Sequence, residues 1–326
     1  MHRKLATDTL VVRVARGVPE GARDLVAVEE PLAIVAEHGP PEARERTPLA
    51  VTMRTPGHDL DLARGFLRSE GVVRAPGDLL ALRHCAGTRD ARRGERDAGA
   101  TRHAGSERDA GSNRVRAVLA PGVTLPPRLF NRRFPTTSAC GICGAASLDA
   151  LHALGARPLG PAGPDAPALD ARALRSMLEA LEAAQTCFRH TGGTHAAALF
   201  DQRHRLALLR EDVGRHNALD KVIGAATDEA LHAASALVMT SRASFELVHK
   251  AVMARVPVLV TVGAASSLAV EAAERFGLTL IAFARDDRFN VYAGAERVAF
   301  SESAGRRART PAPVEPGSRP PMEARG

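Results

Sequence analysis

Apolar and polar positions alternate in long blocks over the second half of the chain. Continuous apolar runs at residues 236–240, 256–262 and 278–283 predict buried strands, and the stretches 244–254 and 267–276 between them have helical periodicity. Strands that alternate with helices in this way are typical of a parallel sheet covered on both faces. The pattern therefore predicts an α/β domain with a parallel sheet.

The segment before these strands extends the same domain. Asp170 is suited to cap a helix that runs to about residue 184, because Leu174, Leu178 and Leu181 fall on one helical face. Two apolar runs, 195–200 and 206–210, are separated by a short polar stretch, as in a hairpin, and a helix is expected over residues 216–226.

The first half of the chain has a different pattern. Short apolar runs at 10–14, 25–28, 32–35, 49–53 and 115–119 suggest strands. One helix is expected over residues 59–70, and Gly71 is suited to end it. The sequence thus predicts a small strand-rich domain over residues 1–135, followed by the larger α/β domain over residues 136–302.

Two segments lack the residues that build a core. Residues 87–113 contain no Leu, Ile, Val or aromatic residue, so we expect a disordered insertion over residues 87–114, and the Pro-, Arg- and Gly-rich residues 303–326 are expected to form a disordered tail. The net charge is +7, and residues 87–116 and 303–326 each contribute +3 of it. Because neither segment contains an aromatic residue for base stacking, a nucleic-acid partner is not expected.

Cys140 and Cys143 form a C-x-x-C pair in a chain whose start has no signal peptide and which has no apolar run long enough to span a bilayer. We therefore expect a cytoplasmic protein without a membrane partner. In a reducing compartment such a pair is more often a thiol-exchange site, a sulfur carrier or half of a metal site than a structural disulfide. Cys85 and Cys187 do not form a second C-x-x-C, so a four-thiolate metal site is not expected.

The residues after the pair favour reactive thiols. Leu148, Leu151 and Leu154 follow at helical spacing, which places the cysteines at or just before a helix N-terminus. Exposed N–H groups and the helix dipole there favour a thiolate, which can accept a sulfane sulfur and hold it as a persulfide. The alternative is that Cys140 and Cys143 are ordinary small loop residues.

Three further segments carry candidate binding residues, each with a structural alternative. Residues 211–221 place Arg215, His216 and Asn217 at an expected helix start, or else form a capped surface helix with Asp220 and Lys221 in solvent. The glycines in residues 191–195 suit either close approach to a ligand or a simple turn. Arg285 and Arg288 could grip a phosphate, or could pair locally with neighbouring aspartates.

These segments together resemble the formate dehydrogenase accessory sulfurtransferase (FdhD) family. The resemblance runs from about Leu10 to Ala299, outside the insertion and the tail. Its motifs are long and keep their order. They comprise residues 52–71, 134–144, 191–200, 211–224, 244–250 and 283–292.

The resemblance implies a concrete activity. The larger domain is expected to be layered like cytidine deaminases, and the protein is expected to form a homodimer. Family members take sulfur from a cysteine desulfurase as a cysteine persulfide and pass it to the molybdenum of a bis-molybdopterin guanine dinucleotide cofactor, which formate dehydrogenase requires. By position, Cys140 matches the persulfide cysteine and Cys143 its partner. The matching cofactor-binding residues are Phe283, Ala284, Arg285, Asp286, Asp287 and Arg288.

Two other functions compete with sulfur transfer. A zinc-dependent deaminase needs an H-x-E…P-C-x-x-C arrangement, but Ala139 precedes Cys140, and neither His58 nor His84 begins an H-x-E. A chaperone that binds the molybdenum cofactor without moving sulfur would need Arg285 and Arg288 but not the cysteines. The intact cysteine pair is the sequence feature that favours sulfur transfer over this second alternative.

Overall fold

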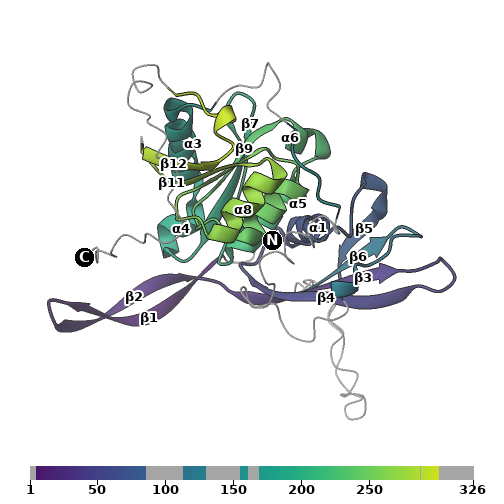
Figure 1. Ribbon diagram of the computed structural model, residues 1–326. Helices are drawn as coiled ribbons and strands as arrows, with labels where there is room; N and C mark the ends of the chain where they lie inside the picture. Colours follow the sequence, from purple (N-terminus) through teal and green to yellow (C-terminus); the bar gives the residue numbers. More distant parts are fainter. Residues whose placement is uncertain (1–4, 86–112, 130–154, 161–168, 287, 301–326) are drawn as a thin grey trace, which may run out of the picture.

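The computed structural model describes residues 5–85, 113–129, 155–160, 169–286 and 288–300. They form a six-stranded sheet with helices on its faces, a four-stranded sheet and a separate two-stranded hairpin (Figure 1). The expected insertion, apart from its last two residues, and the expected tail from residue 303 lie outside the described residues, as does the expected domain boundary near residue 135.

The larger sheet has the order β12-β11-β10-β9-β7-β8. Its strands are β7 (His195–Asp201), β8 (Leu206–Asp212), β9 (Ala234–Met239), β10 (Val258–Thr261), β11 (Thr279–Arg285) and β12 (Arg288–Ala293). Only β9, β10 and β11 are parallel, whereas β7 is antiparallel to β8 and β9, and β12 is antiparallel to β11. The predicted parallel pairing of these three strands is confirmed, as is the predicted hairpin of β7 and β8, whereas β12 was not predicted as a strand. The links from β7 to β8 and from β11 to β12 are too short for a parallel crossover, which takes a dozen residues or more.

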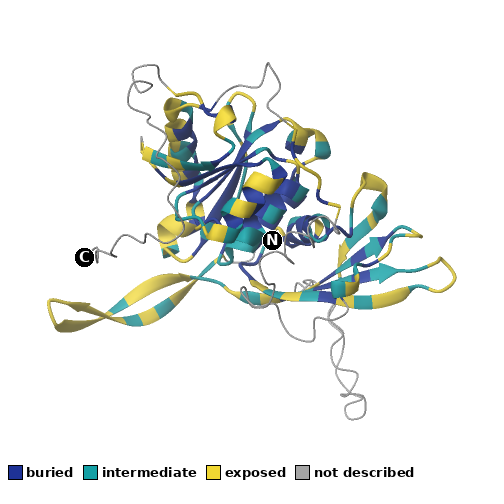
Figure 2. Ribbon diagram, in the orientation of Figure 1, coloured by how far each residue is buried: buried dark blue, intermediate teal, exposed yellow. Residues whose placement is uncertain are grey.

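Helices pack on both faces of this sheet (Figures 1 and 2). One face carries α5 (Arg215–Ala225), α7 (Phe245–Met253) and α8 (Ser267–Phe276), whose buried side chains form one core with the strands. The other face carries α3 (Ala171–Ala184) through Leu174, Met177 and Leu181. The expected cap is confirmed, because the Asp170 carboxylate accepts the N–H of Ala173 at 2.7 Å.

The smaller sheet has the order β4-β3-β6-β5. Its strands are β3 (Glu30–His38), β4 (Glu45–Arg54), β5 (Leu79–His84) and β6 (Arg114–Leu119). The helix α1 (Asp59–Ser69) buries Leu62, Phe66 and Leu67 against one face, and Gly71 follows it with φ 67°, as the sequence predicts. Strand β5 was not predicted, and Arg114, placed by the sequence in the insertion, begins β6.

The two sheets meet through the crossing of α1 and α5. A Cβ at Gly65 would lie 1.9 Å from the carbonyl oxygen of Asp220, and one at Gly224 would lie 1.8 Å from that of Asp61. Only glycine therefore allows the two backbones to approach this closely. The crossing holds the smaller sheet against the larger domain.

Buried ion pairs surround this crossing. The Lys250 ammonium on α7 lies 2.8 Å from both carboxylate oxygens of Asp220, and the Ser69 hydroxyl donates to the same carboxylate at 3.0 Å. Lys221 is the next residue of α5, and its Nζ lies 2.7 Å from Asp212. Asp220 and Lys221 are both buried, so the alternative that placed them on a solvent-facing helix surface is wrong.

Strands β1 (Ala6–Ala15) and β2 (Val18–Ala27) form the hairpin, which projects away from the rest of the molecule (Figure 1). Its base contacts the short helix α4 (Thr186–Thr191). The remaining short elements are α6 (Asp228–His232) and the 3-10 helices Pro76–Asp78, Pro127–Leu129 and Ala295–Arg297. Within the described ranges, every helix is too short or too polar to span a bilayer.

Candidate functional site

One edge of the larger sheet brings most of the predicted binding segments together. Strands β8, β9, β10 and β11 end at this edge. Strands β7 and β12, which are antiparallel to their neighbours, begin there. The loops that follow β9, β10 and β11 therefore lie side by side. Ligands of open α/β sheets bind at this kind of edge, beyond the carboxyl ends of the strands.

Backbone hydrogen bonds join these loops. Ala243 N–H donates to the carbonyl of Ala264 at 2.9 Å, and Phe283 N–H donates to that of Gly263 at 3.1 Å. A Cβ at Gly263 would lie 2.9 Å from the backbone of Arg242, so the first two loops approach closely because residue 263 is glycine. The loops that follow β9, β10 and β11 therefore converge at this edge.

The edge has a positive electrostatic character. Helices α5, α7 and α8 all begin here, at Arg215, Phe245 and Ser267, and helix N-termini present N–H groups and a positive dipole end. The exposed guanidinium-bearing residues of the adjoining loops are Arg242, Arg285 and Arg288. This arrangement suits an anionic ligand.

The predicted cofactor segment is a strained hairpin. Arg285 and Arg288 are opposite each other at the turn between β11 and β12, whereas the sequence suggested a loop after the last strand. Phe283 and Asp286 both have positive φ, 52° and 46°, a conformation that bulky side chains such as phenylalanine rarely adopt. Strain of this kind gathers at functional sites. The Phe283 side chain is 45% exposed, whereas Ala284 is buried in the core and contributes only backbone, and Asp287 lies outside the described residues.

His216 and Glu246 face each other across the N-termini of α5 and α7. Their Nε2 and Oε2 atoms are 3.8 Å apart, and the neighbouring imidazole lowers the pKa of Glu246 to about 2, with help from the Ser244 hydroxyl. Glu246 therefore stays ionised at neutral pH. The sequence singled out His216 but gave no sign that Glu246, 30 residues later, would lie beside it.

His195 lies at the start of β7, where the Thr240 hydroxyl is 3.5 Å from its Nδ1. Burial lowers the pKa of His195, and the nearby Arg215 and His216 lower it further. The imidazole is therefore neutral at pH 7. It can donate or accept a hydrogen bond at this edge without adding charge.

Asn217 does not point toward the edge. Its amide donates to the carbonyl of Met53 at 2.7 Å and to Asp212 at 3.1 Å, and Lys221 Nζ donates to the carbonyl of Thr55 at 2.8 Å. Burial raises the pKa of Asp212, and the Lys221 ammonium opposes the rise. These residues of the predicted binding segment instead join the end of β4 to the start of α5.

The two glycines in residues 191–195 also have structural roles. Gly192, with φ 63°, ends α4, and a Cβ at Gly193 would lie 3.2 Å from the Cβ of Ala27 at the hairpin base. The Glu211 carboxylate accepts the N–H groups of Thr186, Cys187 and Phe188 at the other end of α4. These contacts support the turn interpretation for Gly192 and place Gly193 against the base of the hairpin.

Cys140 and Cys143 lie outside the described residues. Cys85 and Cys187 are described, and both are free thiols. Burial raises the pKa of Cys187, so its thiol stays protonated and is a weak nucleophile.

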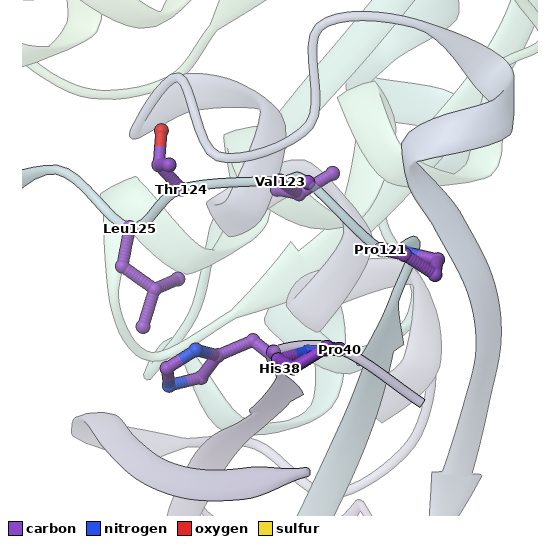
Figure 3. Close-up of a pocket in the computed structure, with 8 residues that line it drawn as sticks. His38, Pro40, Pro121, Val123, Thr124 and Leu125 are labelled. Atoms are coloured by element: carbon purple, nitrogen blue, oxygen red, sulfur yellow. The ribbon is translucent and has the colours of Figure 1, made fainter. Parts of the chain in front are cut away.

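A hollow of about 470 Å³ lies elsewhere, on the smaller sheet between the ends of β3 and β6 (Figure 3). It is lined by His38, Gly39, Pro40, Pro121, Gly122, Val123, Thr124 and Leu125. None of these residues carries a permanent charge, so the hollow does not suit the anionic ligand that the strand edge favours.

Comparisons with known proteins find relatives over nearly the whole chain. The chain is 44% identical over 299 residues to a protein named sulfur carrier protein FdhD from Mycobacterium bovis, covering 91% of this chain and 96% of the relative. It is 42% identical over 297 residues to a protein of the same name from Streptomyces coelicolor, covering 90% and 96%.

A solved structure shares the fold. The crystal structure of a candidate formate dehydrogenase accessory protein from Desulfotalea psychrophila superimposes with a TM-score of 0.63 at 20% identity, covering 90% of this chain and 100% of the other. Residues 27–299 match the model of the FdhD/NarQ family. This range contains the strand edge and every segment that forms it. The chain belongs to the FdhD/NarQ family.

Proposed function

We propose that this protein is a sulfur carrier for the maturation of formate dehydrogenase. The observation that carries the proposal is the 42–44% identity, over about nine tenths of the chain, to proteins named sulfur carrier protein FdhD. The proposal includes a cytoplasmic location, a cysteine desulfurase as donor and sulfurtransferase activity. It also includes the cytidine-deaminase-like layering, which the helices on both faces of the larger sheet support.

Sulfur loading is an exchange at Cys140. The Cys140 thiolate attacks the outer sulfur of the donor's cysteine persulfide, the donor's S–S bond breaks, and the donor cysteine leaves as a thiolate. The new S–S bond leaves Cys140 as a persulfide, and no external oxidant is needed. Cys143, three residues later in the C-x-x-C, is the neighbouring thiol that supports this chemistry.

The strand edge would hold the substrate, the molybdenum atom in its bis-molybdopterin guanine dinucleotide cofactor. Three helix N-termini and the guanidinium groups of Arg285 and Arg288 fit the pyrophosphate of such a cofactor. The exposed ring of Phe283 offers a stacking surface for a base, and Asp286 or Asp287 could accept from the amino group of guanine.

Loading is tested by mass spectrometry after incubation with a cysteine desulfurase and cysteine. We expect one added sulfur, about 32 Da, that is lost on reduction because a persulfide is a reversible modification. The Cys140→Ala, Cys143→Ala double variant should stay unloaded and should fail to restore formate dehydrogenase activity. Cys85→Ala removes a thiol elsewhere and should load normally. Unchanged loading of the double variant would contradict the assignment.

Cofactor binding is tested with GDP, which carries the guanine and the pyrophosphate. We expect GDP to bind more tightly than ADP, and Arg288→Ala to weaken GDP binding about tenfold or more, since a charge-assisted hydrogen bond contributes roughly 1.5–3 kcal/mol. Isothermal titration calorimetry measures both affinities. Arg203→Ala is the matched control, because Arg203 is an exposed arginine on the β7–β8 turn at the opposite edge.

The two experiments separate sulfur transfer from a cofactor chaperone that moves no sulfur. A chaperone would bind GDP through Arg288, and the Cys140→Ala, Cys143→Ala variant would still support formate dehydrogenase. Equal affinity for GDP and ADP would remove the guanine part of the proposal and leave sulfur loading unaffected.

A further inference from the structure

The strand edge has two parts with different chemistry, and the first lies over β10, β11 and β12. Arg285 and Arg288 are at the turn between β11 and β12. A Cβ at Gly263 would lie 2.8 Å from Cγ of Arg242, so the Arg242 side chain lies beside the loop that joins β10 to α8. Helix α8 begins at the same place. We call this the cationic part of the edge, and it has the groups that bind a pyrophosphate.

The second part lies over β7 and β9. His195 begins β7, and His216 and Glu246 lie in the first turns of α5 and α7. We call these three residues, together with Arg215, the polar part of the edge. Arg215 adds one positive charge, the ionised Glu246 adds one negative charge, and His195 is neutral. Because the two charges offset each other, the polar part attracts a phosphate less than the cationic part does.

The Glu246 carboxylate has acceptor capacity left for a ligand. Its side chain is 47% exposed, and its distance of 3.8 Å from His216 Nε2 is too long for a hydrogen bond. An ionised carboxylate accepts hydrogen bonds and cannot donate them. Phosphate oxygens also accept and are negatively charged, so Glu246 repels them. Glu246 therefore suits a part of the ligand that carries N–H or O–H donors.

Two buried polar atoms beside Glu246 have no hydrogen-bond partner among the residues that the structure describes. They are His216 Nε2 and Ser244 Oγ. Ser266 precedes α8 as Ser244 precedes α7, and its hydroxyl accepts the N–H of Ala269 at 3.4 Å. Buried polar atoms in folded proteins nearly always have a partner. The two atoms without one indicate that a bound polar group completes this part of the edge.

The spacing of the strands indicates the size of the ligand. In the sheet, β10 and β9 lie between β11 and β7, and three strand spacings of about 4.8 Å give about 14 Å. The exposed ring of Phe283 on β11 offers a stacking surface for one base. A single bicyclic ring system is too small to reach from Phe283 to His195. A ligand that occupies the whole edge therefore carries a second polar group beyond its pyrophosphate.

The substrate of the proposed function has such a second group. Its guanine and its pterin both present a 2-amino-4-oxopyrimidine edge, in which an amino group and a ring N–H lie side by side. Two parallel donors match the two oxygens of a carboxylate, as the guanidinium fork of arginine does. The oxo group of the same edge is an acceptor, and the neutral His195 imidazole has one N–H to donate to it.

We propose that Glu246 binds the amino and N–H donors of the pterin, and that His195 donates to its oxo group, while the cationic part holds the pyrophosphate. This assignment rests on the proposed function, because the substrate named there carries the pterin. Guanine presents the same donors as the pterin. Asp286 is exposed on the hairpin that also carries Phe283, so it is the acceptor for guanine, which leaves Glu246 for the pterin.

Binding of 6-hydroxymethylpterin to the full chain tests the proposal. The protein, saturated with GDP, is titrated into a micromolar solution of this fluorescent pterin, and fluorescence anisotropy measures the affinity. We expect a dissociation constant of about 1 mM or below, as for a well-placed fragment of this size. In 6-hydroxymethyllumazine an oxo group replaces the 2-amino group. We expect it to bind about tenfold more weakly or less tightly still, because it lacks one donor to the carboxylate.

Glu246→Gln keeps the shape of the side chain and replaces one acceptor oxygen with a donor. We expect it to weaken pterin binding about tenfold or more and to abolish the preference for pterin over lumazine. GDP affinity should not change, whereas a general disturbance of the edge would lower it as well. Glu274→Gln is the matched control, because Glu274 is exposed in the last turn of α8, far from the edge, and this variant should behave as the wild type.

Three results would overturn the proposal. A chain that binds GDP but not the pterin would remove the pterin contact and leave the nucleotide site of the proposed function standing. Unchanged pterin affinity in Glu246→Gln would place the pterin elsewhere. Displacement of the pterin by GDP would assign Glu246 to guanine, and Glu246→Gln would then lose the preference for GDP over inosine diphosphate, which lacks the 2-amino group. Failure of the wild type both to load sulfur and to bind GDP would contradict the proposed function itself.

Discussion

Replacing Gly224 with alanine is expected to destabilise the protein by about 3 kcal/mol or more. The new Cβ would lie 1.8 Å from the carbonyl oxygen of Asp61 and 2.6 Å from the backbone nitrogen of Gly65, so one helix must move. Overpacking of this kind costs about 1–3 kcal/mol, and more where backbone opposes backbone. The helical preference of alanine over glycine returns at most about 1 kcal/mol. Urea unfolding of the purified variant measures the change.

Gly65→Ala tests the same crossing from the other helix, since its Cβ would lie 1.9 Å from the carbonyl oxygen of Asp220. Once one substitution has separated the helices, the second should cost less, so the two effects should not add. Gly77→Ala is the control, because a Cβ there meets no atom within 4 Å. Wild-type stability in Gly224→Ala would show that α1 and α5 are not in backbone contact.

The second large effect is expected from Lys250→Met, at about 3–5 kcal/mol of lost stability. Removing the ammonium leaves the Asp220 carboxylate buried without its charged partner, and breaking one side of a buried ion pair costs this much. Burial already raises the pKa of Asp220 against the opposing ammonium, so the variant should raise it further. Thermal and urea unfolding at several pH values provide the measurement.

The sign of the pH dependence follows from the raised pKa. When the folded carboxyl has a higher pKa than the unfolded one, the folded state binds more protons in the interval between them, and stability falls as pH rises through it. The stability that Lys250→Met loses relative to the wild type should therefore become smaller as the pH falls. In the Lys250→Met, Asp220→Leu double variant, both charges are gone, and it should be more stable than Lys250→Met alone. If the loss of stability in Lys250→Met did not change with pH, it would come instead from lost packing of the aliphatic part of the Lys250 side chain.

Local patterns predicted the elements more accurately than their arrangement. The apolar stripe of Leu174 and Leu181 and the cap at Asp170 located α3 to within one residue, and the runs after residue 236 located three strands and two helices. The strand β12 was harder to predict, because the charged turn at residues 285–288 suggested a loop, whereas the polar stretch between β7 and β8 did indicate a hairpin.

The candidate site was predicted in part for a similar reason. Arg285 and Arg288 indicated a phosphate-binding segment, and the structure places this segment beside the loops that follow β9 and β10. By contrast, Asn217 and Lys221 looked like ligand-binding or solvent residues because their partners, Met53 and Thr55, lie more than 160 residues earlier in the chain. Burial created by such a distant contact leaves no local pattern. The strain at Phe283 is invisible in the sequence because phenylalanine has no preference for positive φ.

The crossing of α1 and α5 also affects the order of events during synthesis. Gly65 is synthesised 159 residues before Gly224 (224 minus 65). At about 5–20 residues per second, α1 is therefore made roughly 8–30 s before its contact partner α5 is complete. By then β6 has been made, so Leu62, Phe66 and Leu67 can already be covered by the smaller sheet. The face of α1 that later contacts α5 carries Gly65. Until α5 has been made, this face exposes little apolar surface at that position to other nascent chains or to chaperones.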